Sequence, residues 1–356
     1  MSVKIRFNPA STAGVVLAKV GNPQREEPLQ TSKEVFKIED SDQNTLTALF
    51  LKPFKNLMGH RFTHHSSLSK HEMNSYTKGI FASEDGLLKY GCEIAKRLYV
   101  KSNHPNIKAG DLCVALIRDI EVNGELTLGL CILKSETVTP FFSITTSNGD
   151  LHLATVHGIN PEKIDKGCLI LDTFRDQGYY VLTFDRSGAE SRFWIREFLG
   201  VRAVPDAAFL TKSYTNLAVS VMESEKPTEE SPPEKNVTAA GDALGFFDDK
   251  ENFDLKEFEE KVLKTPEAKS RFAEEKKKIE EETGAPLEKS FQISKKHVSQ
   301  AKKKVNTVVK LDSGVEIHLK PIFATQKEPV LERGFDEEKG MKFIKVFFNK
   351  DLSGEG

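Results

Sequence analysis

"DLCVALIRDIEVNGELTLGLCILKSE" (residues 111–136) decides the fold, because it has the pattern of two β-strands joined by a tight turn. Both halves are rich in aliphatic and β-branched residues, which favour strands. Asn123 and Gly124 between them supply the positive φ angles that a two-residue hairpin turn requires. A turn at these residues would place Cys113 opposite Lys134. The stretch therefore predicts an antiparallel hairpin.

The same pattern recurs twice downstream, in "PFFSITTSNGDLHLATV" (residues 140–156) and "KGCLILDTFRDQGYYVLTFDR" (residues 166–186). We expect the three consecutive hairpins to form one antiparallel β-meander. Apolar residues at helical spacing predict three helices before the meander, and two after it. The first three helices are expected at residues 44–54, 67–81 and 84–102, and the two later ones at residues 190–199 and 206–222. A first strand is expected before all of them, at residues 14–20.

The segment "ESEKPTEESPPEKN" (residues 223–236) is rich in Pro, Glu and Ser and nearly free of apolar residues. Such a composition cannot bury enough apolar surface to form a core. We interpret it as a flexible linker between an N-terminal domain (residues 1–222) and a smaller C-terminal domain (residues 237–356). The predicted fold class is α+β.

Helix-capping signals and short β-rich runs define the C-terminal domain. Asp254 with Glu257 three residues later resembles a capping box, and Thr265-Pro266 supplies a cap and a first-turn proline. The second of these helices is expected to end near Gly284. Strand-like runs then follow at residues 305–312, 315–320 and 342–349, so we expect helices followed by a small sheet.

Composition indicates a soluble globular protein of 356 residues, with 38% hydrophobic and 29% charged residues. The first residues lack the apolar run of a secretory signal, and the longest aliphatic runs are too short to cross a bilayer. We therefore expect a cytoplasmic protein without membrane contact. The four cysteines lack CxxC spacing, and we interpret them as small buried hydrophobic residues.

Sequence motifs for common catalytic sites are missing from the chain. It contains no GxxxxGK[ST] phosphate loop, no GxGxxG fingerprint and no GxSxG elbow. His60 and His64 could bind a metal if they lay on one helix, but the Gly and Ser content around them favours a polar surface loop. We predict no catalytic residue, no cofactor and no metal. An unrecognised metal-dependent nuclease stays open as an alternative.

The stretch "SKKHVSQAKKKVNTVVK" (residues 294–310) carries six lysines and one histidine without an acidic residue, although the net charge of the chain is only -2. With Ser294 as the N-cap, a helical wheel gathers four of the lysines within an arc of about 120°, and Val298, Ala301 and Val305 on another face. One face could therefore contact phosphates while the other packs, although a plain solvated face has the same pattern. The candidate DNA-binding residues are Lys295, Lys296, Lys302, Lys303, Lys304 and Lys310.

Five segments, in order, resemble the bacterial nucleoid-associated protein family of the NdpA type, and most closely its Bacteroides-type members. They are "LAKVGNPQREE" (residues 17–27), "HPNIKAGDLCV" (104–114), "DKGCLIL" (165–171), "SKKHVSQAKKK" (294–304) and "GFDEEKGMKFIKVFFN" (334–349). The resemblance implies a cytoplasmic protein of the nucleoid that organises the chromosome and binds double-stranded DNA with little sequence preference, without catalysis. It transfers no binding motif residue by residue.

We therefore predict a non-enzymatic DNA-binding protein. A symmetric homodimer would double the number of lysines and could bridge duplexes. The alternative from another class is an adaptor that binds a protein partner, such as a DNA-handling enzyme or a phage factor.

Overall fold

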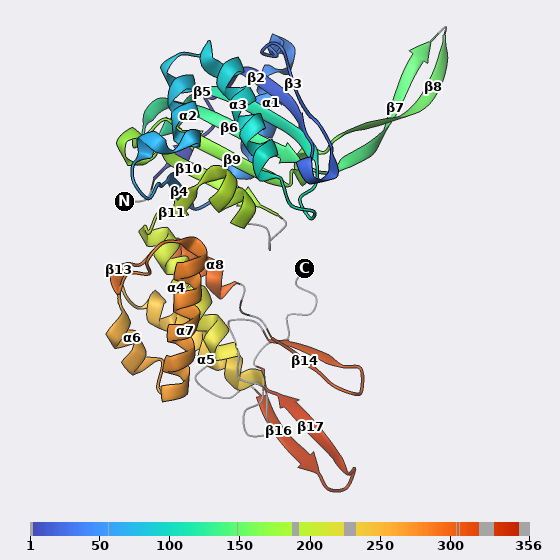
Figure 1. The fold of residues 1–356 in the computed structure, drawn as a ribbon. Helices are drawn as coiled ribbons and strands as arrows, with labels where there is room; N and C mark the ends of the chain where they lie inside the picture. Colours follow the sequence, from blue (N-terminus) through green and yellow to red (C-terminus); the bar gives the residue numbers. More distant parts are fainter. Residues whose placement is uncertain are drawn as a thin grey trace. The chain divides into compact units, whose positions relative to one another are not determined.

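The computed structural model describes residues 3–55, 57–147, 149–186, 192–223, 233–303, 305, 307–319 and 331–348. They belong to two units, Met1–Val204 and Pro205–Gly356. Both contain helices and antiparallel strands, as Figure 1 shows. The predicted α+β class is confirmed.

An antiparallel sheet organises the first unit. Among its described residues, nine strands take part, in the order β11-β4-β10-β9-β6-β5-β2-β3, with β1 paired to β5. The strands are β1 (Ile5–Arg6), β2 (Ser11–Val20), β3 (Leu29–Thr31), β4 (Gly59–Phe62), β5 (Gly110–Val122), β6 (Glu125–Ser135), β9 (Lys166–Leu171), β10 (Tyr180–Asp185) and β11 (Val201–Ala203).

Helices cover both faces of this sheet, because its central strands are apolar on both sides. Alternate residues of β6 point to opposite faces, so that Leu130 and Ile132 join one core while Cys131 and Leu133 join the other. The first core is covered by α2 (Glu72–Ala82), α3 (Gly86–Lys101) and the π-helix η6 (Arg192–Leu199), and the second by α1 (Asp40–Leu51) and the 3-10 turn η2 (Lys52–Phe54). Four further 3-10 turns lie in the described loops: η1 (Pro23–Arg25), η3 (Leu68–Lys70), η4 (Pro161–Lys163) and η5 (Arg175–Gln177).

The hairpin of β5 and β6 confirms the prediction from residues 111–136, except for its register. Asn123 and Gly124 form the turn with φ angles of 54° and 93°. A β-bulge between Ile117 and Ile120 then shifts the pairing by one residue. Cys113 consequently lies opposite Leu133, so the predicted pairing with Lys134 was wrong. The sequence has no distinct signal for this bulge.

The middle hairpin does not join the meander. β7 (Val138–Ser147) and β8 (Asp150–Ile159) pair only with each other among the described strands, while β6 pairs directly with β9. Figure 1 shows this hairpin projecting from the first unit. Below we call β7 and β8 together the arm. The predicted meander of three hairpins is therefore wrong at its centre.

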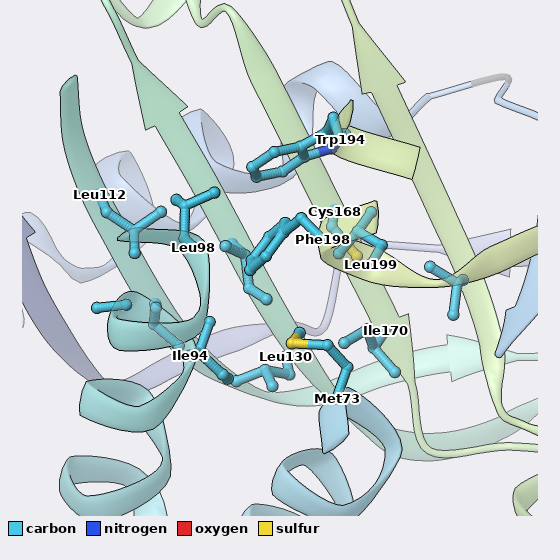
Figure 2. Packing of buried hydrophobic residues seen from close by; sticks show 14 of the residues in the cluster. Met73, Ile94, Leu98, Leu112, Leu130, Cys168, Ile170, Trp194, Phe198 and Leu199 are labelled. Atoms are coloured by element: carbon cyan, nitrogen blue, oxygen red, sulfur yellow. The ribbon is translucent and has the colours of Figure 1, made fainter. Parts of the chain in front are cut away.

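The single tryptophan anchors η6 against the sheet, as shown in Figure 2. Trp194 is 0% exposed, and its ring lies 4.7 Å from that of Phe198. Its indole Nε1 donates to the Thr183 hydroxyl at 3.1 Å, which satisfies the buried polar atom. Trp194 is therefore part of the first core.

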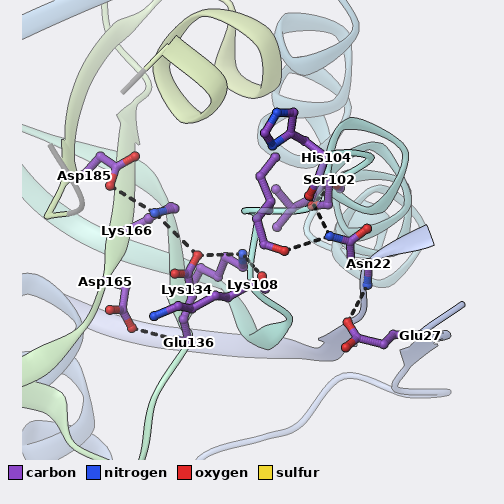
Figure 3. Close-up of polar contacts among 12 residues, drawn as sticks. Asn22, Glu27, Ser102, His104, Lys108, Lys134, Glu136, Asp165, Lys166 and Asp185 are labelled. Atoms are coloured by element: carbon purple, nitrogen blue, oxygen red, sulfur yellow. Dashed lines mark hydrogen bonds and ion pairs between the residues drawn. The ribbon is translucent and has the colours of Figure 1, made fainter. Parts of the chain in front are cut away.

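A buried cluster of charges lies where the arm leaves the sheet (Figure 3). The side-chain amine of Lys134 lies 2.8 Å from Glu136, and that of Lys166 lies 3.4 Å from Glu136 and 3.0 Å from Asp185. Asp165 accepts a hydrogen bond from the Glu136 backbone N–H at 2.6 Å. Burial lowers the pKa of Lys134, and the charge of Glu136 opposes this effect. The cluster thus connects the end of β6 with the beginning of β9 at the root of the arm.

The described part of the second unit contains a helical bundle and three small antiparallel strand pairs. Its helices are α4 (Ala207–Glu223), α5 (Pro233–Asp248), α6 (Leu255–Lys261), α7 (Pro266–Thr283) and α8 (Lys295–Lys302). Its strands form three pairs, β12 (Asn252–Asp254) with β13 (Ser290–Gln292), β14 (Thr307–Lys310) with β15 (Glu316–Leu319), and β16 (Leu331–Asp336) with β17 (Met341–Val346). In the part that the structure describes, the predicted small C-terminal sheet is therefore two separate hairpins, β14 with β15 and β16 with β17.

Both predicted helix starts are capped as the sequence indicates. The Asp254 carboxylate accepts the Glu257 N–H at 3.0 Å, and the Thr265 hydroxyl accepts the Ala268 N–H at 3.2 Å. α7 ends at Thr283, and Gly284 follows it with a φ of 66°, the left-handed conformation that favours glycine at this position.

The unit boundary lies earlier than the boundary inferred from composition. α4, which we assigned to the N-terminal domain (residues 1–222), packs into the second unit, because Tyr214 stacks 5.4 Å from Phe291 and lies 4.4 Å from Phe253. Of the predicted linker (residues 223–236), residues 224–232 lie outside the described residues, and α5 begins at Pro233. Composition shows where a segment lacks apolar residues, but not against which unit its neighbours pack.

Candidate nucleic-acid interface

The basic stretch that begins at Ser294 forms a short helix, α8, whose apolar side packs as predicted. Val298, Ala301 and the following Val305 are buried. Ala301 and Val305 contact Ala240 and Leu244 of α5. The lysines are thereby turned away from this buried side, and the helix is held at a defined orientation within the second unit.

Two of the candidate lysines are engaged with the end of α5. The amine of Lys295 donates to the carbonyl oxygen of Asp248 at 2.6 Å and also contacts the carbonyl oxygens of Phe247 and Lys250. Lys302 lies 2.6 Å from the Asp248 carboxylate. A lysine at this position satisfies backbone carbonyls that a helix leaves unpaired at its C-terminus. Lys295 and Lys302 therefore have a structural role in the second unit.

The other two lysines of the wheel, Lys296 and Lys303, are exposed. They are seven residues apart, so two helical turns bring them to nearly the same side, at a spacing of about 10 Å along the axis. The predicted single face of four lysines is thus divided into two rows. One row binds α5 and the other faces solvent.

The structure does not describe the side chains of the two remaining candidate lysines. Lys304 lies outside the described residues, and Lys310 is the last residue of β14, of whose side chain nothing is described.

Lys212 is a basic residue that the sequence reasoning missed. Burial lowers the pKa of His297, and the positive charges of Lys296 and Lys212 lower it further. Lys212 on α4 therefore lies close enough to α8 to add to its positive field. Lys212 and Lys296 are far apart in sequence, so only the packing of α4 against α8 reveals their proximity.

The histidine-rich segment is a structural element. His60 lies on β4 instead of in the expected polar loop, and burial lowers its pKa to about 4. His71 caps α2, because its Nδ1 accepts the Asn74 N–H at 3.1 Å while its Nε2 donates to the Gly200 carbonyl oxygen at 3.1 Å. In the part of the chain that the structure describes, no three His, Cys, Asp or Glu side chains are placed to hold a metal ion.

None of the helices described is both long and apolar enough to cross a lipid bilayer. A search of curated proteins found no match to this chain.

A comparison with protein families assigns the chain. The family described as nucleoid-associated protein YejK matches residues 16–329, which include most of both units. This confirms the resemblance to a bacterial nucleoid-associated family, while the closer resemblance to Bacteroides-type members stays a prediction. The chain therefore belongs to the nucleoid-associated protein YejK family.

Proposed function

We propose that this protein binds double-stranded DNA at the bacterial nucleoid, in the cytoplasm, with little sequence preference and without catalysis. The observation that carries the proposal is the exposed row formed by Lys296 on α8 and Lys303 directly after it, in a chain of a nucleoid-associated family. Lys212, Lys304 and Lys310 complete the proposed phosphate-binding group.

Lysine is suited to this task because its amine is a compact charge that neutralises phosphate regardless of the base sequence. Each neutralised phosphate releases condensed counterions, and this release drives non-specific binding. Residues 294–310 contain no arginine, so the bidentate contact to guanine that specifies sequence is not expected from this stretch. The proposed interface therefore positions DNA without selecting a sequence.

We further propose that the protein acts as a symmetric homodimer. One chain presents only a few exposed lysines on α8, whereas a two-fold assembly presents two such groups. Two groups on opposite sides of a dimer could hold two duplex segments, which is how a protein of modest net charge can organise a chromosome.

The test is DNA binding by the full chain at several salt concentrations, using two unrelated duplexes of equal length. The double variant Lys296→Gln/Lys303→Gln should weaken binding to both duplexes alike. The slope of log K against log salt is negative, and its magnitude should fall by about 2, because each lost phosphate contact removes about 0.9. A matched control is Lys269→Gln/Lys277→Gln, which removes the same charge from exposed positions on α7.

An unchanged affinity and slope in the Lys296→Gln/Lys303→Gln variant would contradict the proposal and favour the adaptor. An equal loss in the α7 control would show that only overall charge matters. The absence of catalysis is tested with supercoiled plasmid and Mg²⁺ or Mn²⁺, where no nicking is expected. Metal-dependent nicking would instead support the nuclease alternative.

A further inference from the structure

One side of the arm is largely apolar and exposed. Cross-strand partners of a hairpin lie on the same side, and successive pairs alternate between the two sides. The pairs Val138–Ile159, Pro140–His157, Phe142–Thr155, Ile144–Leu153 and Thr146–Leu151 therefore share one side, which we call the arm's apolar face although it includes His157. Six of these residues are large exposed hydrophobics: Val138, Phe142, Ile144, Leu151, Leu153 and Ile159.

The opposite side of the arm is mostly polar or small. It carries Thr139–Gly158 and Phe141–Val156 near the root, followed by Ser143–Ala154, Thr145–His152 and Ser147–Asp150. The hairpin is thus amphipathic, which is the pattern expected of a strand pair whose apolar side is buried against another surface. Phe142 and Leu151 are nevertheless 82% and 76% exposed. A two-stranded hairpin without a covered face is marginal in water.

The apolar face leads directly into a groove at the root of the arm. Ile159 is part of the arm's apolar face and also lines the groove. The other apolar residues that line the groove include Val15, Leu17, Phe36, Ile38 and Phe50. The groove has a volume of about 290 Å³, whereas an apolar cavity of about 150 Å³ already accommodates benzene. It therefore has room for more than one apolar side chain.

Charge argues against nucleic acid as the occupant of this surface. Residues 138–159 contain no lysine or arginine, and their only acidic residue is Asp150. A polyanion needs cations to bind, so the arm offers DNA no electrostatic attraction. Natural sheets also protect exposed edges with charged residues, particularly lysine. An arm with only one acidic residue and no lysine or arginine is suited to an apolar protein surface.

We propose that the occupant is a second copy of this chain, with the arm of each copy seated against the groove of the other. Both the donor and the acceptor surface belong to the same unit, which is what a two-fold interface requires. The six side chains of the arm's apolar face bury on the order of 400 Å² per copy. A stable interface buries about 800 Å² per partner, so the groove is needed to supply the rest. The inference rests on the dimer proposed above and identifies its surface.

The test measures the mass of the full chain by sedimentation. The arm variant Phe142→Ser/Leu153→Ser places two hydroxyls on the apolar face, and the control variant Val100→Ser/Leu126→Ser changes two similarly exposed hydrophobics of the first unit outside the arm and groove. We expect wild type and control to sediment as dimers, and the arm variant to dissociate at a concentration at least tenfold higher. Circular dichroism verifies that each variant is folded.

A second variant changes the groove, so that the interface can be tested even if the arm variant fails to fold. Leu17→Ser, at the partly exposed wall of the groove, should weaken the dimer in the same direction. If the protein stays a dimer in both variants, the inference is overturned. The dimer must then form through another surface, and the proposal of DNA binding is unaffected. Wild-type monomers would overturn the dimer as a whole, and monomers that co-sediment with phosphatidylcholine vesicles would assign the arm to lipid. DNA binding, measured separately, distinguishes these outcomes from failure of the lysine interface.

Discussion

The side-chain amine of Lys295 lies 2.6 Å from the carbonyl oxygen of Asp248, so the first residue of α8 caps the last turn of α5. A basic stretch that appears uniform in sequence thus contains residues with different tasks. Lys295 and Lys302 hold the second unit together, whereas Lys296 and Lys303 face solvent. This division makes stability and DNA binding separable by mutation.

Lys295→Gln should destabilise the second unit by about 1–2 kcal/mol, because the carbonyl oxygens at the end of α5 lose a charged donor. Lys303→Gln removes the same charge from an exposed position and should change the free energy of unfolding by less than about 0.5 kcal/mol. Urea denaturation followed by circular dichroism measures both. Equal stabilities would mean that the contact with Asp248 contributes nothing.

Glu136→Gln should destabilise the first unit by about 3 kcal/mol, because Lys134 and Lys166 would be left buried without this negative partner. The control is Glu162→Gln, since the ion pair of Glu162 with Lys52 is exposed and worth less than about 1 kcal/mol. The midpoints of urea denaturation give the comparison. A Glu136→Gln variant as stable as the control would contradict a structural role for the buried cluster.

Stability should fall as the pH decreases from 6.5 to 4, partly because of His71. Burial lowers the pKa of His71 to about 4, so in this range the unfolded chain binds a proton that the folded chain does not. The free energy of unfolding therefore rises with pH across this window, by on the order of 3 kcal/mol for this residue. Denaturation at several pH values measures the slope.

The matching variant is His71→Asn, which keeps an acceptor for the N-terminus of α2 but does not titrate. We expect it to be less stable than wild type at pH 7, because the bond to Gly200 is lost, and to show a shallower decline toward pH 4. An equally steep decline would assign the pH dependence to other groups, such as His60.

Trp194 should report the integrity of the first core. Because its ring is buried against Phe198, its emission should be blue-shifted and poorly quenched by iodide. Phe198→Ala should reduce stability by about 3–5 kcal/mol and leave a cavity beside the indole. The urea-unfolded protein is the reference for a fully accessible tryptophan. Iodide quenching of the folded protein at the level of this reference would contradict the packing.

Limited proteolysis should cut first within residues 223–236, as their composition predicts. Because α4 packs with Phe253 and Phe291 beyond the cut, the two fragments should stay associated under native conditions and separate only in denaturant. Size-exclusion chromatography followed by gel electrophoresis distinguishes the two states. Fragments that separate without denaturant would return the boundary to residue 222.

Local sequence patterns were sufficient for many of the individual elements. The Asn123-Gly124 turn, the caps at Asp254 and Thr265, and the buried side of α8 depend on neighbouring residues, whose effects act over a few positions of the chain. The resemblance to the nucleoid-associated family was likewise visible in short ordered segments, and the family match confirms it.

Only the tertiary structure decided what these elements contact. The strand pattern of residues 138–159 is the same whether a hairpin joins a sheet or projects as an arm, because alternation records a buried side and not its partner. Nor can a helical wheel show that Lys295 meets Asp248, or that Lys212 approaches His297, since these residues are brought together by packing between distant segments. Sequence determined the local geometry and the family, whereas long-range packing decided which lysines remain at the surface.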